Sequence, residues 1–172
     1  MNEQSEQQAN RRPSDSEIEL ALLMGPNDAN AMGNVHGGVI MRLADEAGAL
    51  AAMRHAGKLV VTVRIDSMTF LEPVRVGYLL QLKARVNWVG NTSIEVGVRV
   101  EASNPITGEG IHTNSAYFVY VALDERGRPS PVPGLELENE AQRRRWQEAE
   151  ERREIRLEKR TQAQESWQSH RR

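Results

Sequence analysis

One segment, Val39 to His55, limits the folds open to this chain, because its apolar residues have the spacing of a core α-helix. They recur every three or four positions, as on one face of a helix. Gly57 follows as a stop signal. A single helix cannot enclose a core, so the rest of the core must come from a sheet. The apolar residues of the helix are Ile40, Leu43, Ala44, Ala47, Leu50 and Ala51.

Most of the remaining apolar residues alternate with polar ones, which is typical of strands. One short run, at 18–22, precedes the helix, and four runs follow it, at roughly 59–70, 79–89, 93–102 and 111–123. Gly90 and Asn91 form a turn between the second and third of these four runs. We expect the four later strands to follow one another as a meander.

This order predicts an α+β domain in which an antiparallel sheet curls around the one apolar helix. Beyond Gly134 the composition changes, because 137–172 is dense in Glu and Arg with i,i+4 pairs such as Glu140 with Arg144. Apolar positions there are too sparse for a coiled-coil seam. Two interpretations stay open: a solvated surface helix, or a helix that staples an oligomer. The predicted parts of the chain are a disordered tail at 1–15, a folded domain at 16–134 and a charged helical extension at 135–172.

Composition excludes several classes of protein. The 172 residues include no cysteine, so neither disulfides nor thiolate metal sites can form. The net charge is −2 with basic and acidic residues interspersed, which lacks the basic patch of a nucleic-acid binder. No apolar run is long enough to span a bilayer, and the first residues have no signal-peptide core. These features predict a cytoplasmic protein without a membrane or nucleic-acid partner.

The segment from Asn34 through His36, Gly37 and Gly38 leads into the helix and is a candidate site for a developing oxyanion. The first N–H groups of a helix have no partner within it, and glycine lets a ligand approach them closely. The alternative is that the two glycines only form a tight turn. Both interpretations are open on these residues alone.

Asp45 lies on a helix face lined mostly by small residues. Small neighbours suggest that a backbone, a partner helix or a substrate packs there, which would leave Asp45 usable as a general base. The alternative is a surface ion pair with Arg42, although Glu46 is the better partner for that arginine. The other residues on this face are Met41, Gly48, Ala49 and Ala52.

The histidines do not indicate a metal site. His36 stands beside the glycines, and because no nucleophile elbow of the G-x-S-x-G type is present, we expect it to have a supporting role. His55, His112 and His170 lack ligand spacing with acidic residues. Phosphate-binding and dinucleotide-binding glycine patterns are also missing. The sequence therefore predicts neither a metal nor a cofactor.

A series of motifs runs from Ile18 to Gly134, namely PNDAN at 26–30, GNVHGG at 33–38, DEAG at 45–48, VTV at 61–63, DSMTF at 66–70 and AYF at 116–118. In combination these motifs resemble the hotdog-fold acyl-CoA thioesterases. The closer likeness is to the group of the bacterial YciA-type enzymes and the brain-type acyl-CoA hydrolases.

The resemblance implies a helix wrapped by an antiparallel sheet, dimers joined edge to edge, and often a trimer of such dimers. It implies a catalytic carboxylate at Asp45 and an assisting amide at Asn34, which meet across the dimer interface. Helix-start N–H groups near Gly38 would polarise the thioester carbonyl. Thr92 and Ser93 match positions where relatives approach coenzyme A. Asp66 also matches the family pattern, without an assigned role.

The leading hypothesis is hydrolysis of fatty acyl-CoA to free fatty acid and coenzyme A. Asp45 acts as general base or nucleophile, Asn34 comes from the partner subunit, and Gly38 N–H stabilises the oxyanion beside His36 and Gly37. Two alternatives stay open: a hotdog hydratase or dehydratase, which needs a His–acid pair, and a hotdog acyl-CoA-binding regulator, which needs a DNA-binding domain. Chain-length preference depends on pocket depth, which no spacing in the sequence reveals.

Overall fold

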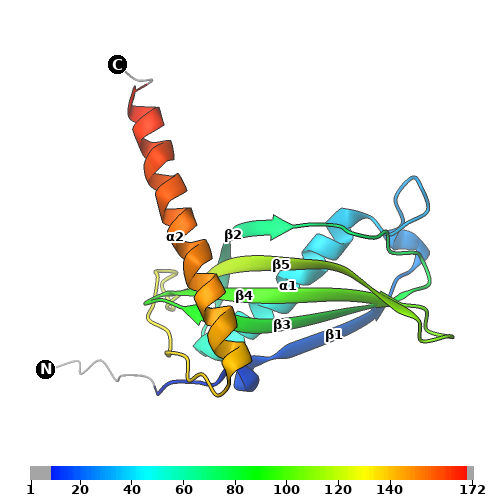
Figure 1. Ribbon diagram of the computed structural model, residues 1–172, viewed down its shortest axis with the longest axis horizontal. Coiled ribbons are helices and arrows are strands. Elements are labelled where there is room, and N and C mark those ends of the chain that lie inside the picture. Colours follow the sequence, from blue (N-terminus) through cyan, green and yellow to red (C-terminus); the bar gives the residue numbers. More distant parts are fainter. Residues whose placement is uncertain (1–8, 170–172) are drawn as a thin grey trace, which may run out of the picture. The chain divides into compact units, whose positions relative to one another are not determined.

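The computed structural model describes residues 9–169 (Figure 1). The chain divides into two compact units between Glu136 and Leu137. The first unit contains a sheet and one long helix, and the second contains the other long helix. In chain order the elements are η1 (Pro13–Ser16), β1 (Ile18–Leu23), η2 (Pro26–Asp28), α1 (Gly37–Ala56), β2 (Val60–Met68), β3 (Leu79–Val89), β4 (Ser93–Ser103), β5 (Gly110–Ala122) and α2 (Glu140–Ser169).

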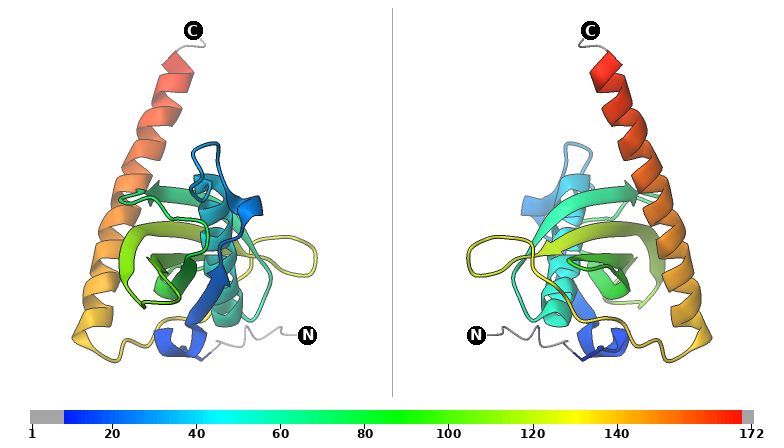
Figure 2. Two further views of the ribbon diagram at one scale, coloured as in Figure 1. Left: turned by 90° about the vertical axis from the view of Figure 1, so that its right-hand side faces the viewer. Right: turned by 90° about the vertical axis from the view of Figure 1, so that its left-hand side faces the viewer.

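The helix α1 is the centre of the first unit, and the strands curve around it (Figures 1 and 2). The strands form one sheet in the order β1-β3-β4-β5-β2, and all neighbours are antiparallel. This arrangement confirms the predicted α+β fold, with an antiparallel sheet wrapped around one apolar helix.

The strand β2 does not lie where the predicted meander would place it. It pairs with β5 at one edge of the sheet, whereas β3 pairs with β1 and β4. Only β3, β4 and β5 form a meander. The segment 69–78 after β2 is too long for a tight hairpin and passes the start of α1, where Val74 O accepts a hydrogen bond from Val35 N–H at 2.8 Å. This path carries the chain away from β2 before β3 begins.

Small residues let α1 lie close to the sheet. The buried face differs from the predicted one, because Leu50 is 42% exposed while Gly48 and Ala52, predicted to lie beside Asp45, are buried. Alanine and glycine occur on both sides of this helix, so hydrophobic spacing alone defined its inward face poorly. The buried residues of α1 are Ile40, Leu43, Ala44, Ala47, Gly48, Ala51, Ala52, His55 and Ala56.

The described part of the predicted N-terminal tail is folded. Arg11 N–H donates to Gly134 O at 2.9 Å, and the Arg11 guanidinium donates to the carbonyls of Arg54 and His55 in the last turn of α1. Carbonyls at a helix C-terminus have no partner within the helix, and a cation there is favourable. The ordered domain therefore begins before the predicted boundary at residue 16.

The helix α2 is charged along its length and begins with a side-chain cap. Asn139 Oδ1 accepts a hydrogen bond from Gln142 N–H at 3.0 Å. The expected pair between Glu140 and Arg144 is not the one formed, because each charge has a different partner. Such exposed ion pairs each contribute about 0–1 kcal/mol to the free energy of unfolding. The ion pairs include Glu140–Arg143, Arg144–Glu148 and Glu150–Arg153.

Neither α2 nor another helix of the described chain is long and apolar enough to cross a membrane.

His55 is a buried residue near the end of α1. Its Nε2 lies 3.0 Å from the carbonyl oxygen of Pro133, and its Nδ1 is buried without a hydrogen-bond partner among the described residues. Burial lowers the pKa of His55, because the charged imidazolium would lose its hydration. His55 is therefore neutral in the folded protein and donates from Nε2 to Pro133.

We predict that His55 makes the folded protein less stable as the pH falls below its ordinary pKa of 6.5. The unfolded chain then takes up a proton that the folded chain does not, so stability is lost from that pH down toward the lower folded pKa. His55→Gln retains a donor for Pro133 but cannot titrate. When the pH is lowered from about 7 to about 5, the Tm of both proteins should fall, and the decrease for His55→Gln should be smaller than the decrease for the wild type by about 2 °C or more. Thermal unfolding of both proteins measures this, and equal decreases would assign the pH dependence to other groups.

Candidate active site

His36 caps the N-terminus of α1. Its backbone is extended, and its Nδ1 accepts a hydrogen bond from Gly38 N–H at 2.9 Å. The ring of Phe70 lies over Gly37, so a Cβ at Gly37 would crowd that ring, and a Cβ at Gly38 would crowd His36. The absence of a side chain at both positions therefore lets Phe70 and His36 lie against the start of α1. A substrate oxygen that binds Gly38 N–H would have to replace His36 Nδ1.

Asn30 holds the loop that leads into α1. Its Oδ1 accepts hydrogen bonds from Met32 N–H at 2.9 Å and from Asn34 N–H at 3.2 Å, and its own N–H donates to Asn34 O at 2.7 Å. The backbone of Asn34 thus helps to close the loop. Among the described residues, no hydrogen bond uses the side-chain amide of Asn34 or the side-chain NH₂ of Asn30.

The carboxylate of Asp45 faces β2 and β5. Its Oδ1 accepts hydrogen bonds from Thr62 Oγ1 at 2.8 Å and from the Tyr120 phenol at 3.1 Å. The same phenol lies 3.0 Å from the backbone oxygen of Asp45. Arg42 pairs instead with Glu46, at 2.6 Å. The surface pair between Asp45 and Arg42 is therefore not formed, and no described residue donates to Asp45 Oδ2.

Tyr120 is a fully buried side chain whose ring lies 6.1 Å from that of Phe118. Burial raises the pKa of the Tyr120 phenol far above its ordinary range, and the negative charge of Asp45 raises it further. Tyr120 therefore acts only as a neutral hydrogen-bond donor. Its hydroxyl reaches α1 because Gly48 has no side chain; a Cβ at Gly48 would overlap the phenol oxygen.

Helical spacing in the sequence predicts Asp45 on a face of small residues but does not reveal Thr62 and Tyr120 as its partners. Period-two alternation puts Tyr120 on the same face of β5 as Phe118, which predicts an ordinary core residue. Thr62 is paired with Tyr120 across the β2–β5 ladder. This pairing joins positions far apart in the sequence, so only the strand order reveals it.

The other predicted residues lie outside this cluster of hydrogen bonds. Thr92 is in the turn between β3 and β4, and Ser93 begins β4 opposite Val121. Ser93 O accepts a hydrogen bond from Gly90 N–H within the turn, and Thr92 O accepts one from Ala122 N–H at the end of β5. Asp66 forms an ion pair with Arg64 on β2, with 2.6 Å between Arg64 Nε and Asp66 Oδ1. The structure thus gives Asp66 an ion-pairing role.

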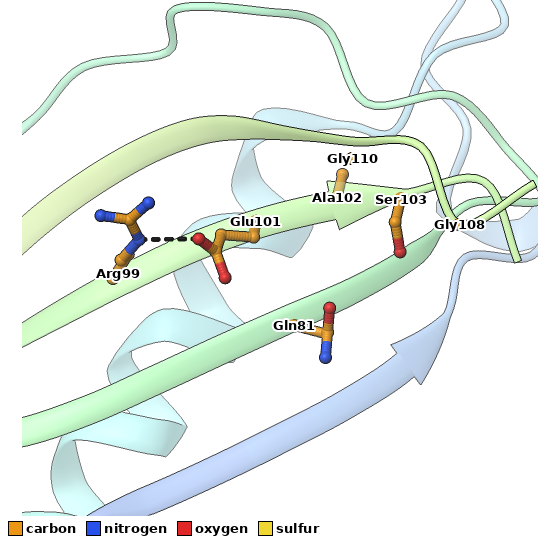
Figure 3. Close-up of a pocket in the computed structure, with 7 residues that line it drawn as sticks. All are labelled: Gln81, Arg99, Glu101, Ala102, Ser103, Gly108 and Gly110. Carbon is orange, nitrogen blue, oxygen red and sulfur yellow. Dashed lines mark hydrogen bonds and ion pairs between the residues drawn. The ribbon is translucent and has the colours of Figure 1, made fainter.

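An open hollow lies over β3 and β4 (Figure 3), and Asp45 is not among the residues that line it. Glu101 there accepts hydrogen bonds from Arg99 at 2.8 Å and from Lys83 at 3.2 Å, and these bonds lower the pKa of Glu101. The charged residues of this hollow are paired with one another or with Lys83, and none of the predicted site residues lines it. The hollow is therefore not a candidate for catalysis. Nor does the described chain contain a cluster of three or more potential metal ligands. The hollow is lined by Gln81, Arg99, Glu101, Ala102, Ser103, Gly108 and Gly110.

Comparison with known proteins identifies the family. The family model of the thioesterase superfamily matches residues 32–109. The acyl-CoA thioester hydrolase YciA of Salmonella typhimurium is 44% identical over 121 residues, which are 68% of this chain and 90% of that protein. The chain belongs to the hotdog-fold acyl-CoA thioesterases. This result confirms the family that the motifs indicated.

Solved structures of this family agree with the fold. An apo-hexameric acyl-CoA thioesterase superposes with a TM-score of 0.84 at 38% identity, covering 88% of this chain and 97% of that chain. An acyl-CoA hydrolase of Staphylococcus aureus was solved with butyryl coenzyme A, coenzyme A and coenzyme A disulfide. It gives a TM-score of 0.85 at 31% identity, covering 94% of this chain and 99% of that chain. These structures confirm the predicted hotdog fold and the predicted class of acyl-CoA thioester hydrolases.

We predict that His36→Ala weakens the start of α1, because Gly38 N–H loses its acceptor. Loss of a capping side chain costs about 1 kcal/mol, which lowers Tm by about 2–4 °C in a domain of this size. His36→Asn introduces another good capping residue and should retain most of the stability. Thermal unfolding compares the three proteins. If all three unfold at the same temperature, the His36 cap does not stabilise α1.

Proposed function

We propose that this protein hydrolyses fatty acyl-CoA to a fatty acid and coenzyme A, with Asp45 as the reacting carboxylate. One observation carries the proposal: Asp45 is held through Oδ1 by Thr62 and Tyr120, and no described residue donates to Oδ2. A carboxylate held on one oxygen is oriented for reaction on the other. Membership of the acyl-CoA thioesterase family supports the thioester as substrate.

Two chemical routes are compatible with this carboxylate. As a general base, Asp45 Oδ2 takes a proton from water, whose oxygen attacks the thioester carbonyl; the C–S bond then breaks, and coenzyme A leaves as a thiolate that takes up a proton. As a nucleophile, Oδ2 attacks the carbonyl itself, and the C–S bond breaks as coenzyme A leaves as a thiolate that takes up a proton. Water then hydrolyses the resulting mixed anhydride to the free fatty acid and the Asp45 carboxylate. In either route, helix-start N–H groups near Gly38, beside His36 and Gly37, would stabilise the oxyanion.

The spacing of Gly38 and Asp45 supports a site shared between two subunits. Residues seven positions apart in a helix are separated by about 10 Å along its axis. An oxyanion donor must lie within about 3 Å of the carbonyl oxygen, while the carboxylate must lie within about 3 Å of the carbonyl carbon as a nucleophile, or of the water that attacks this carbon as a base. One subunit would therefore supply Asp45, and its partner would supply the start of its own α1.

The free edge of β2 is suited to pairing with a second copy. Within the described part of the chain, β2 has a strand neighbour on one side only, and Val61, Val63 and Ile65 are 44%, 54% and 41% exposed. An open edge with exposed apolar side chains favours pairing with another strand. A two-fold axis would join the two β2 edges. We therefore expect a dimer as the catalytic unit and, by analogy with the hexameric neighbours, a trimer of dimers.

Two asparagines are candidates for the assisting amide. The GNVHGG motif favours Asn34. Structures of the Staphylococcus aureus hydrolase include alanine variants of an asparagine, an aspartate and a threonine; the asparagine lies 15 positions before the aspartate, and the threonine 17 after it. In this chain the same spacings from Asp45 lead to Asn30 and Thr62. This comparison favours Asn30, and the two assignments can be tested together.

We predict that Asp45→Asn reduces turnover about 10²-fold or more while the protein remains folded, because the amide keeps the volume but cannot accept a proton. Thiol release from a panel of acyl-CoAs of increasing chain length measures the activity. Asp124→Asn is the matched control, since Asp124 lies in the loop after β5, where it pairs with Arg128. Turnover by Asp45→Asn within a few-fold of the wild type would exclude Asp45 as the reacting group. If the wild type released no thiol from any acyl-CoA, the regulator and hydratase alternatives would become the leading ones.

Mixed dimers test where the site is assembled. We predict that one of the two variants Asn30→Ala and Asn34→Ala removes the assisting amide and is inactive alone. Asp45→Ala should also be inactive alone. Refolding that variant together with Asp45→Ala should restore activity, because one of the two sites in a mixed dimer receives both intact residues.

The two asparagine variants control for each other in this experiment. Distinguishable tags and mass spectrometry confirm that mixed dimers form, and thiol release is compared with each variant refolded alone. The asparagine variant that is inactive alone and is rescued by Asp45→Ala identifies the assisting residue. Confirmed mixed dimers without a gain in activity would refute a site shared between subunits.

A further inference from the structure

Asp45 meets Thr62 on β2 and Tyr120 on β5, and the Tyr120 hydroxyl in turn lies against Gly48, three residues further along α1. We infer that Tyr120 is a positioning residue that fixes the Asp45 carboxylate for reaction, and that position 48 is glycine to admit the Tyr120 hydroxyl. This inference rests on the proposed function of Asp45.

The Tyr120 phenol contacts both the side chain and the backbone of one residue. Its oxygen lies 3.1 Å from Asp45 Oδ1 and 3.0 Å from Asp45 O. A donor shared between these two acceptors ties the carboxylate to its own helix backbone and so restricts side-chain rotation. Thr62 donates to the same Oδ1 from β2. With Oδ1 held from two strands, the carboxylate can present only Oδ2 to a reactant.

Gly48 is explained by the same contact. Glycine is an unfavourable residue in the interior of a helix, so a specific reason for its presence is expected. Here a Cβ would overlap the Tyr120 oxygen and lie 3.2 Å from the ring carbon that carries it. The small face around Asp45 thus admits a side chain from the protein's own sheet. Tyr120 is buried, so its ring cannot easily shift to make room for a larger residue.

Charged groups near Asp45 are paired among themselves. On α1, Arg42 pairs with Glu46, and on β2, Arg64 pairs with Asp66. β5 contributes the neutral phenol of Tyr120. Removal of the phenol hydroxyl is therefore expected to loosen the carboxylate without leaving an unpaired charge beside it.

Tyr120→Phe tests the positioning role, because the ring stays in place and only the hydroxyl is lost. We expect kcat to fall about 10- to 100-fold, since a hydrogen bond to a charged group is lost. KM should change by less than about threefold, because Tyr120 positions the reacting carboxylate and is buried away from the substrate. Tyr78→Phe, on the half-buried tyrosine before β3, is the matched control and should keep the wild-type kcat and KM. An unchanged kcat for Tyr120→Phe would overturn the inference.

A double-mutant cycle tests the pairing with Gly48. Gly48→Ala alone should lower Tm by about 4 °C or more and reduce kcat at least as much as Tyr120→Phe, because the new methyl group displaces the phenol oxygen. In Gly48→Ala/Tyr120→Phe that oxygen is absent, so Tm should recover relative to Gly48→Ala, while kcat stays low. Additive effects of the two changes on Tm would contradict the proposed steric relation.

The failure of this inference can be told apart from failure of the proposed function. If Asp45→Asn retains turnover, Asp45 is not the reacting group, whatever the Tyr120 variant does. If Asp45→Asn is inactive while Tyr120→Phe behaves like the wild type, only the positioning role of Tyr120 is wrong. The Tm cycle with Gly48 needs no substrate, so it tests the packing relation in both cases.

Discussion

The close contact between α1 and the sheet is the constraint on which the other features of the domain depend. A helix with large side chains on every face would keep the sheet at a distance, whereas Ala44, Ala47, Gly48, Ala51 and Ala52 let the strands approach its backbone. Large side chains on the sheet fill the space between them; burying one such as Phe118 contributes roughly 1.5–3 kcal/mol. The stability of the core thus comes largely from the sheet.

This contact also explains how a carboxylate is held in a largely apolar interior. Asp45 is half-buried, and an ionised group there needs hydrogen bonds to replace its lost hydration. Thr62 and Tyr120 supply them from adjacent strands, and neither carries a charge that would neutralise the carboxylate. The result is an anion that is fixed in direction but keeps one oxygen for reaction. A salt bridge with Arg42 would instead have engaged the carboxylate oxygen that is left for reaction.

The two ends of α1 are held by different means. At its start, His36 accepts a hydrogen bond from Gly38 N–H, which the helix leaves unpaired, and Asn30 holds the loop that leads into the helix. At its end, Arg11 binds the last carbonyls, and His55 contacts Pro133. Segments from before β1 and after β5 therefore meet at the C-terminal end of α1. The helix is held at both ends, which keeps Asp45 at a constant position relative to the sheet.

The sequence by itself determined the element types, the family and the identity of the reacting carboxylate candidate. Period-two alternation identified the strands, one helical stretch required a sheet around it, and the motifs from PNDAN to AYF indicated the hotdog acyl-CoA thioesterases. These are local signals, read from neighbouring residues. The tertiary structure decided what depends on distant contacts: β2 pairs with β5, Leu50 faces outward, and Tyr120 meets Asp45 above Gly48. Alternation states which face of a strand is buried, but not which strand lies beside it, and so it could not reveal the partners of Asp45.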